Sequence, residues 1–171
     1  FAVAGAGDVN GDGLDDLVVG AKHADPNGVS SGASDVIFGH AGAFAANYDL
    51  VNVNGTNGFK LSGGAAGDQF GASVSSAGDV NGDGFSDIII GAKYADPSGR
   101  NYSGAIYVVF GAASGFGANI DLASLNGANG FKLSGAMPFD YSGRSVSGAG
   151  DFNGDGFDDL IVGAYGADPN G

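Results

Sequence analysis

The segment "DVNGDGFSDIIIGA", residues 79–92, joins an acidic, glycine-rich loop directly to an apolar run, and close copies of it occur twice more. These copies are "DVNGDGLDDLVVGA" at 8–21 and "DFNGDGFDDLIVGA" at 151–164. Their first residues lie 71 and 72 positions apart along the chain. A long, regular spacing of this kind indicates a protein built from repeated structural units, each of which packs on its neighbours.

The repetition extends well beyond this segment. The sequence "NGFKLSG" occurs without change at 57–63 and 129–135. We therefore expect one domain segment over 1–171, with repeats at approximately 1–69, 70–141 and 142–171, of which the first and last are incomplete. The second copy has one extra residue within "RNYSG" at 100–104, where a surface loop would accommodate it.

Each complete repeat contains four strand-like runs separated by Gly, Asn, Asp, Pro or Ser. The run "DIIIG" is continuously apolar, as expected of a strand covered on both faces. The pattern predicts an all-β fold of four-stranded antiparallel blades arranged as a β-propeller, with ten strands or about two and a half blades in this chain. In the second repeat we expect strands at 71–78, 86–95, 104–111 and 130–135, with a long outer connection at 111–129.

The composition supports strands and turns rather than helices. Glycine accounts for 35 of 171 residues, proline for four, and all 19 acidic residues are Asp. The absence of cysteine excludes a disulfide scaffold, a thiolate metal site and a Cys nucleophile. The net charge of −13 argues against nucleic acid as a partner, and the short apolar runs argue against membrane insertion.

The acidic loops carry oxygen-bearing side chains at alternating positions. Oxygen ligands spaced in this way around a tight turn can converge on one hard cation, and calcium suits a site supplied almost wholly by protein oxygens. We therefore predict three calcium sites, with a solvated hairpin loop as the alternative. The predicted side-chain ligands, at loop positions 1, 3, 5 and 9, are Asp8, Asn10, Asp12 and Asp16; Asp79, Asn81, Asp83 and Asp87; and Asp151, Asn153, Asp155 and Asp159. Position 7 would supply a backbone carbonyl from Leu14, Phe85 and Phe157.

The loops differ from an EF-hand at its most informative position. An EF-hand needs a bidentate Glu at position 12, where this chain has Val19, Ile90 and Val162 within apolar runs. A dockerin-type loop, which expects an acidic residue there followed by a helix, does not fit for the same reason. The nonapeptide repeat of secreted toxins has a much shorter period than the repeat in this chain.

The stretch "FGASVSSAGDVNGDGFSDIIIGA" at 70–92 resembles the FG-GAP repeat of integrin α-subunit propellers and their bacterial relatives. Phe70 and Gly71 form its FG element, Ala77, Gly78 and Asp79 lie near its GAP element, and the metal loop follows. The third repeat departs from the pattern, since Ser142 stands where the family has Phe. The resemblance implies a calcium-braced propeller in which the metal loops join the first two strands of each blade.

This resemblance favours a calcium-binding, non-enzymatic module for extracellular or cell-surface adhesion, with a protein or glycan ligand. Further blades or other copies would be needed to cover the open strand edges, so we expect a fragment of a larger secreted or surface protein. One alternative is a structural repeat of a surface protein or fibre, assembled by strand pairing between chains. Another is the propeller part of a secreted hydrolase, for which only His23 and His40 are available as histidine bases.

Two further sets of residues allow more than one interpretation. One set of aromatic residues could form a sugar-stacking platform, although packing within the blades is the simpler interpretation: Tyr94, Tyr102, Tyr107, Phe116 and Tyr141. The recurrent "ADPNG" and "ADPSG" segments, which contain Asp25, Asp96 and Asp168, are typical of turns. A second cation site in these segments is the alternative.

Overall fold

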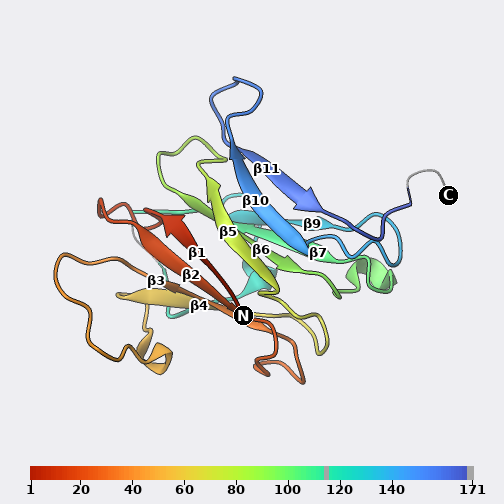
Figure 1. Ribbon diagram of the computed structural model, residues 1–171, viewed down its shortest axis with the longest axis horizontal. Helices are drawn as coiled ribbons and strands as arrows, with labels where there is room; N and C mark the ends of the chain where they lie inside the picture. The colour runs from red at the N-terminus through yellow and green to blue at the C-terminus, as the bar shows by residue number, and fades with distance from the viewer. Residues whose placement is uncertain (114–115, 169–171) are drawn as a thin grey trace.

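The computed structural model describes residues 1–113 and 116–168 and confirms an all-β architecture (Figure 1). The first sheet contains β1 (Ala2–Gly7), β2 (Asp16–Ala21), β3 (Ala33–Ile37), β4 (Gly58–Ser62) and β8 (Asn119–Ile120). The second contains β5 (Ser73–Gly78), β6 (Asp87–Ala92), β7 (Ala105–Val109) and β9 (Gly130–Ser134), and the third contains β10 (Ser145–Gly150) and β11 (Asp159–Gly163). Among the described residues, no helix has the length and apolar character needed to cross a bilayer.

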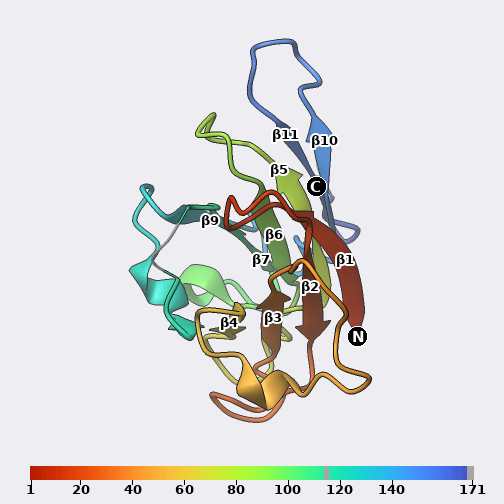
Figure 2. The same cartoon turned by 90° about the vertical axis from the view of Figure 1, so that its left-hand side faces the viewer.

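The three sheets stand side by side like the blades of a propeller. The first strands of the three sheets, β1, β5 and β10, lie next to one another (Figure 2). The sheets therefore meet along their first strands. The second sheet has the strand order β5-β6-β7-β9, with every pair antiparallel, as the sequence predicts. The first sheet has the equivalent four strands, and the third has the first two, giving two and a half blades.

Strand β6 forms the most buried part of the structure, because it lies in the blade that has a neighbour on each side. All six of its residues are buried, as the continuous apolar run predicts. Ile88 and Ile90 join the core shared with the first blade, whereas Ile89 joins the core shared with the third. Alternate residues of one strand therefore serve two different interfaces, as the two-residue period of a strand requires.

Each pair of first and second strands has a β-bulge immediately before the acidic loop. The register shifts between Gly5 and Gly7, between Ser76 and Gly78, and between Gly148 and Gly150. The second residue of each pair is a glycine with a positive φ, between 65° and 75°, which residues other than glycine rarely adopt. Each acidic loop therefore follows the same local distortion of its strand pair.

The outer connection at 111–129 differs from the prediction, because it contributes a strand to the preceding blade. Its β8 pairs in parallel with β4, so the first sheet has a fifth strand and is not wholly antiparallel. The ring of Phe116 stacks on Phe59 with centroids 4.5 Å apart and also contacts Phe38. The connection thus acts as a strap that covers the edge of one blade with a segment of the next.

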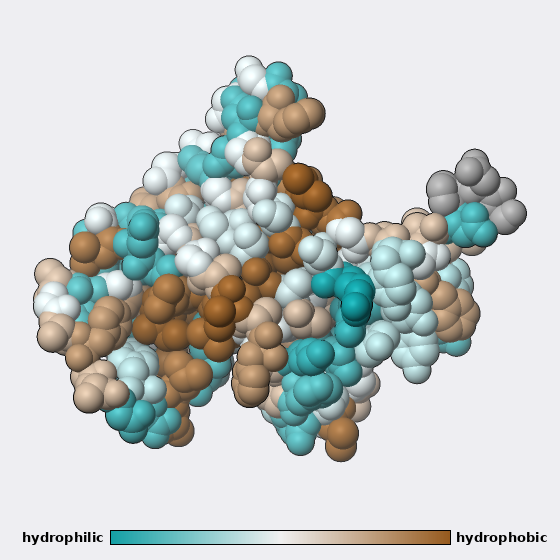
Figure 3. All heavy atoms as spheres, viewed as in Figure 1, coloured by the Kyte–Doolittle hydropathy of each residue, from teal (hydrophilic) through white to brown (hydrophobic). Residues whose placement is uncertain are grey.

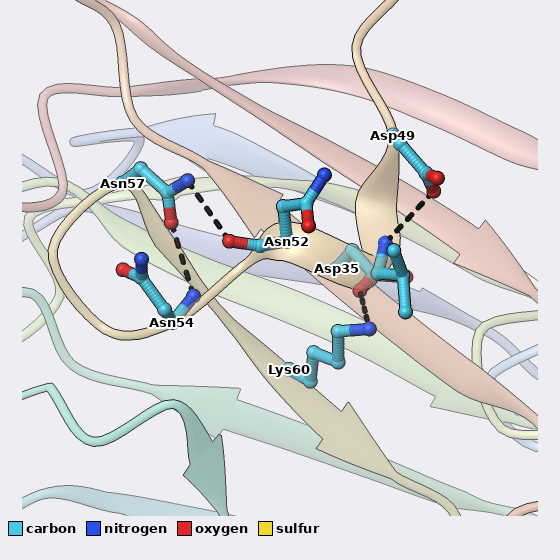
Figure 4. A network of polar contacts seen from close by, with 7 residues as sticks. Asp35, Asp49, Asn52, Asn54, Asn57 and Lys60 are labelled. Atoms are coloured by element: carbon cyan, nitrogen blue, oxygen red, sulfur yellow. Dashed lines mark hydrogen bonds and ion pairs between the residues drawn. The ribbon is translucent and has the colours of Figure 1, made fainter.

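The two complete blades share a turn that lies just before the fourth strand. In the first blade, Asp49 begins the 3-10 helix η1 (Leu50–Asn52) by accepting a hydrogen bond from the backbone N–H of Val51 (Figure 4). The side chain of Asn57 then accepts from the backbone N–H of Asn54 and donates to the backbone carbonyl of Asn52. The same bonds recur in the second blade, where Asp121 begins the 3-10 helix η3 (Leu122–Ser124) and Asn129 bridges Asn126 and Ser124.

Apolar side chains remain exposed on the first and third sheets. Phe1 is 98% exposed, Val3 on β1 is 74% exposed, and Ile161 on β11 is 60% exposed. Hydrophobic residues also gather across the middle of the face seen in Figure 3. These surfaces contrast with β6, whose corresponding residues are covered on both faces by neighbouring blades.

Candidate metal centres

The three acidic loops occupy the same place in each blade. They join β1 to β2, β5 to β6 and β10 to β11, and they project from the same end of the blades (Figure 1). This is the position that the resemblance implied, between the first two strands of a blade. Val19, Ile90 and Val162, at position 12 of the loops, lie in strands β2, β6 and β11.

The position-1 carboxylate organises the backbone of each loop. In the second blade, Oδ1 of Asp79 accepts hydrogen bonds from the backbone N–H groups of Gly82 and Asp83, at 2.7 and 3.1 Å. Its Oδ2 accepts from the N–H of Gly84, at 2.8 Å. Asp8 and Asp151 make the same three bonds in the first and third blades. The turn therefore closes around one carboxylate, and the positive φ angles of its glycines make that closure possible.

Positions 3 and 5 follow the same pattern within the turn. The side-chain oxygen of Asn81 accepts from the backbone N–H of Asp83, and its amide donates to Oδ2 of Asp83 at 2.8 Å. Oδ1 of Asp83 accepts from the backbone N–H of Phe85. The same bonds occur in the first loop. The structure thus brings the predicted side chains of positions 1, 3 and 5 together in one turn.

The position-9 Asp lies at the base of the loop and has a structural role that the sequence analysis missed. Asp87 is fully buried, and its Oδ2 accepts from the backbone N–H of Val80 while its Oδ1 accepts from that of Gly111, both at 2.9 Å. Gly111 follows the third strand of the blade, so this carboxylate ties the loop to that strand. Asp16 is equally buried and bridges Val9 and Gly39 in the same way.

Asp159 makes only part of this connection. Its Oδ2 accepts from the backbone N–H groups of Phe152 and Asn153, and its Oδ1 lies 3.4 Å from the side-chain amide of Asn153. Within residues 1–113 and 116–168 no third strand pairs with β11, so in that part of the chain Asp159 has no partner equivalent to Gly39 or Gly111.

The carboxylates of one loop act on each other electrostatically. Burial raises the pKa of Asp87 to about 6, against the opposing effect of the N–H groups of Gly111 and Val80. The negative charges of Asp83 and Asp79 raise this pKa further. Burial also raises the pKa of Asp16, with smaller contributions in the same direction from Asp12 and Asp8. The first two loops therefore hold like charges near one another, and a cation among them would relieve the repulsion.

The donor set of each loop suits a hard cation. It consists of carboxylate and amide oxygens, with the backbone carbonyl at position 7 available as well. Across residues 1–113 and 116–168, no three Asp, Glu, His or Cys side chains are close enough to form a metal-binding cluster. At the base of the second loop, both oxygens of Asp87 accept backbone hydrogen bonds. The three calcium sites therefore stay a prediction that rests on donor chemistry and repeated loop geometry.

Consecutive loops contact each other through their position-7 side chains, another feature that the sequence analysis did not identify. The ring of Phe85 lies directly on Gly11 of the preceding loop, where a Cβ atom would overlap it. In the same way, a Cβ atom on Gly82 would lie 2.6 Å from Cε1 of Phe157. The position-7 ring therefore needs a glycine beneath it in the neighbouring blade, in addition to any role of its backbone carbonyl.

Position 8 completes this connection between loops. The backbone N–H of Ser86 donates to the carbonyl of Asp8, and that of Asp158 donates to the carbonyl of Asp79, both at 3.0 Å. The carboxylate of Asp158 also accepts from the N–H of Asp79, at 2.8 Å. These bonds link the predicted sites to one another along the row of blades.

The "ADPNG" and "ADPSG" segments form turns, as the sequence predicts. Oδ1 of Asp25 accepts from the backbone N–H of Ser30, and Oδ1 of Asp96 accepts from that of Tyr102. Pro97 begins the 3-10 helix η2 (Pro97–Gly99). Most of the third copy, at 167–171, lies outside the described residues.

The two histidines lie in the first blade. Nδ1 of His23 is 3.2 Å from Oγ of Ser30, and this pair is exposed. The hydrolase alternative requires a histidine between a serine and a buried Asp, and residues 1–113 and 116–168 contain no hydrogen bond from His23 to a carboxylate. His40 instead contacts the ring of Phe44, with centroids 4.2 Å apart.

The aromatic candidates divide into two groups. Tyr107 is 6% exposed and packs against Phe70, and Phe116 stacks on Phe59, so both serve blade packing. Tyr94, Tyr102 and Tyr141 lie together, with centroids 5.4 to 6.1 Å apart. With Asp68 and Asp96, these three tyrosines line a shallow pocket at the end of the blades opposite to the acidic loops.

Comparison with known proteins supports the repeat assignment. A family model described as FG-GAP repeat matches residues 1–37, 70–109 and 142–171. The chain is 34% identical to integrin alpha-PS2 of Drosophila melanogaster over 164 residues, which cover 94% of this chain and 11% of that protein. It is 34% identical to integrin alpha-IIb of Homo sapiens over 166 residues, which cover 94% of this chain and 14% of that protein. The chain therefore spans only a small part of the length of these relatives.

Proposed function

The chain belongs to the FG-GAP repeat family, and from this premise we propose that it is a calcium-binding, non-enzymatic β-propeller segment. We infer a role in adhesion, outside the cell or at its surface, with a protein or glycan as the ligand. The integrin alpha relatives support this role, although the chain covers only 11% to 14% of the two compared above. In this proposal residues 1–171 form one segment, whose exposed apolar faces are covered by further blades or by other copies.

The repeated loop geometry is the observation that supports calcium binding. Asp8, Asp79 and Asp151 each accept hydrogen bonds from three backbone N–H groups, which lie at equivalent positions in the three loops. This arrangement presents the side chains of positions 3 and 5 in the same turn. A calcium ion held by the predicted ligands would neutralise charges that otherwise raise the pKa values of Asp16 and Asp87.

The contacts between loops suggest what calcium does for the molecule. Phe85 rests on Gly11, and the Asp158 carboxylate accepts from the backbone of Asp79, so the order of one loop supports the order of the next. We infer that calcium stiffens a continuous row of loops at one end of the blades. The other end then remains available for a partner.

Metal stoichiometry tests this proposal directly. We expect three calcium ions per chain by metal analysis after equilibrium dialysis, and a melting temperature that falls when a chelator removes them. At calcium about 100 times the dissociation constant, each site would add about 2.7 kcal/mol to the free energy of unfolding. Extracellular calcium modules typically have dissociation constants of roughly 10⁻⁴ to 10⁻³ M, which sets the concentration range for the titration.

Two substitutions in one loop provide a matched pair. Asp12→Asn changes a predicted ligand at position 5, whereas Asp15→Asn removes the same charge from an exposed neighbour at position 8. The first variant should bind two ions and the second three. Fewer than one ion per loop in the unmodified chain, or an equal loss in the two variants, would contradict the assignment. An adhesion role further predicts calcium-dependent binding to immobilised matrix proteins or glycans without chemical change of the ligand.

A further inference from the structure

The few positive charges of this acidic chain are unevenly distributed. The chain has six Lys and Arg residues against 19 Asp. Three of the six, Lys22, Lys93 and Arg144, lie next to strand ends that point away from the acidic loops. Lys22 follows β2, Lys93 follows β6, and Arg144 precedes β10.

Close backbone contacts between blades bring these three residues near one another. A Cβ atom on Gly91 of β6 would overlap the carbonyl of Gly143, the residue immediately before Arg144. A Cβ atom on Gly20 of β2 would likewise overlap the carbonyl of Gly71. Gly71 lies two residues from Ser73, which pairs with Gly91 across β5 and β6. Successive blades therefore place the cationic side chains on adjoining segments of backbone.

The third repeat keeps a positive charge at this place by a different residue. The position of Lys22 and Lys93 in the repeat is occupied by Tyr165 in the third copy. Arg144 stands where the second copy has Ala72, and its guanidinium lies over the ring of Tyr165, 4.9 Å from the centroid. In the third repeat, an arginine that precedes the adjacent strand therefore supplies the positive charge that a lysine supplies in the first two.

Lys93 lies at the centre of this group and is largely removed from water. It is 9% exposed, and its ammonium group lies 4.7 Å from the centroid of the Tyr94 ring. In the described part of the chain the one salt bridge joins Lys60 to Asp35, so none of Lys22, Lys93 and Arg144 forms an ion pair there. Burial lowers the pKa of Lys93, and the charges of Lys22 and Arg144 lower it further. An anion at this place would offset both effects.

We propose that Lys22, Lys93 and Arg144 form a binding site for a tetrahedral oxyanion, a sulfate or phosphate group carried by a partner. A dianion compensates three cations better than a single carboxylate does, and a guanidinium offers paired N–H donors that match such an oxyanion. The net charge of −13 repels an extended polyanion, so the ligand carries its charge on one isolated group. The site is separate from the acidic loops and does not depend on the proposed calcium binding.

Titration with inorganic sulfate followed by NMR tests the site. With the 171-residue chain at fixed ionic strength and calcium, sulfate should shift the signals of Lys22, Lys93 and Arg144, and acetate should shift them much less. Lys93→Met should weaken sulfate binding about tenfold or more, since a hydrogen bond to a charged group is worth one to two powers of ten in affinity. Lys132→Met is the matched control, because it removes the same charge from another strand and should leave the affinity unchanged.

Arg144→Gln provides a second variant, because Arg144 is exposed and its replacement leaves the buried core intact. It should also weaken sulfate binding about tenfold, with an unchanged circular dichroism spectrum. Glucosamine 6-sulfate and phosphoserine then compare the two sources of the dianion, and tighter binding of one identifies its source. Equal loss in the Lys93 and Lys132 variants, or shifts spread evenly over all cationic side chains, would overturn the proposal.

Discussion

At the residue scale, the glycines of the acidic loops perform two different tasks. Gly82 and Gly154 occupy the same loop position and have φ angles of 76° and 79°. Both positions therefore need the conformational freedom of glycine. Only Gly82 also lies beneath a neighbouring ring, that of Phe157, whereas a Cβ atom on Gly154 would have no atom within 4 Å. The repeat therefore contains its own control, because one position occurs with and without a neighbour.

Alanine substitutions at these two glycines should separate the tasks. Gly154→Ala should lower the free energy of unfolding by about 1–2 kcal/mol, the cost of a left-handed conformation for a residue with a side chain. Gly82→Ala should cost more by about 1 kcal/mol or above, because the added methyl group must also displace Phe157. Urea unfolding of both variants under identical conditions measures the difference. Equal costs would mean that the Phe157 contact does not stabilise the chain.

At the element scale, the second strand in the first two blades lies close to the next blade through a glycine with an ordinary φ angle. Gly91 in β6 lies against the backbone of Gly143 in the next blade, and Gly20 in β2 lies against Gly71. Gly163 in β11 is the third copy of this residue, and the three atoms nearest to a Cβ atom placed there all belong to Ser145, at 3.5 Å or more. The close approach of blades, rather than the strand conformation, therefore requires glycine at the first two positions.

Gly91→Ala and Gly163→Ala form a matched pair that tests this requirement. Gly91→Ala should lower the free energy of unfolding by about 1–3 kcal/mol or more, since the rigid backbone of Gly143 cannot yield as a side chain does. Gly163→Ala should be neutral or slightly stabilising, by about 0.5–1 kcal/mol, because alanine costs less entropy than glycine in a strand. Thermal unfolding by circular dichroism provides the comparison. A larger loss in the Gly163 variant would contradict our account of blade packing.

The sequence predicted the elements of a blade far better than the contacts between blades. The strands β5, β6, β7 and β9 fall within the predicted ranges because turn residues and apolar runs are local signals. Strand β8 was missed, since its two residues form a strand only where the edge of β4 is available. The contact of Phe85 with Gly11 left one trace in the sequence, because position 7 is aromatic in the two copies whose ring lies on a glycine of a neighbouring loop.

At the scale of the whole molecule, negative charge is the main feature that the fold must accommodate. The net charge is −13, and the acidic loops concentrate nine Asp side chains at predicted ligand positions on one end of the blades. The opposite strand ends carry Lys22, Lys93 and Arg144 together with Asp25, Asp68 and Asp96, so both signs of charge occur there. The dense negative charge at the loop end therefore favours cations there.

This distribution predicts a specific interaction between salt and calcium. Without calcium, sodium chloride should raise the free energy of unfolding, because an ionic strength of about 0.15 M shortens the range of charge repulsion to about 8 Å. With three calcium ions bound the net charge would be −7, so less repulsion remains and the same salt should have a smaller effect. Urea unfolding at several sodium chloride concentrations, with calcium or with chelator, measures both dependences. Equal salt dependence in the two states would show that calcium does not neutralise the charges that destabilise the calcium-free chain.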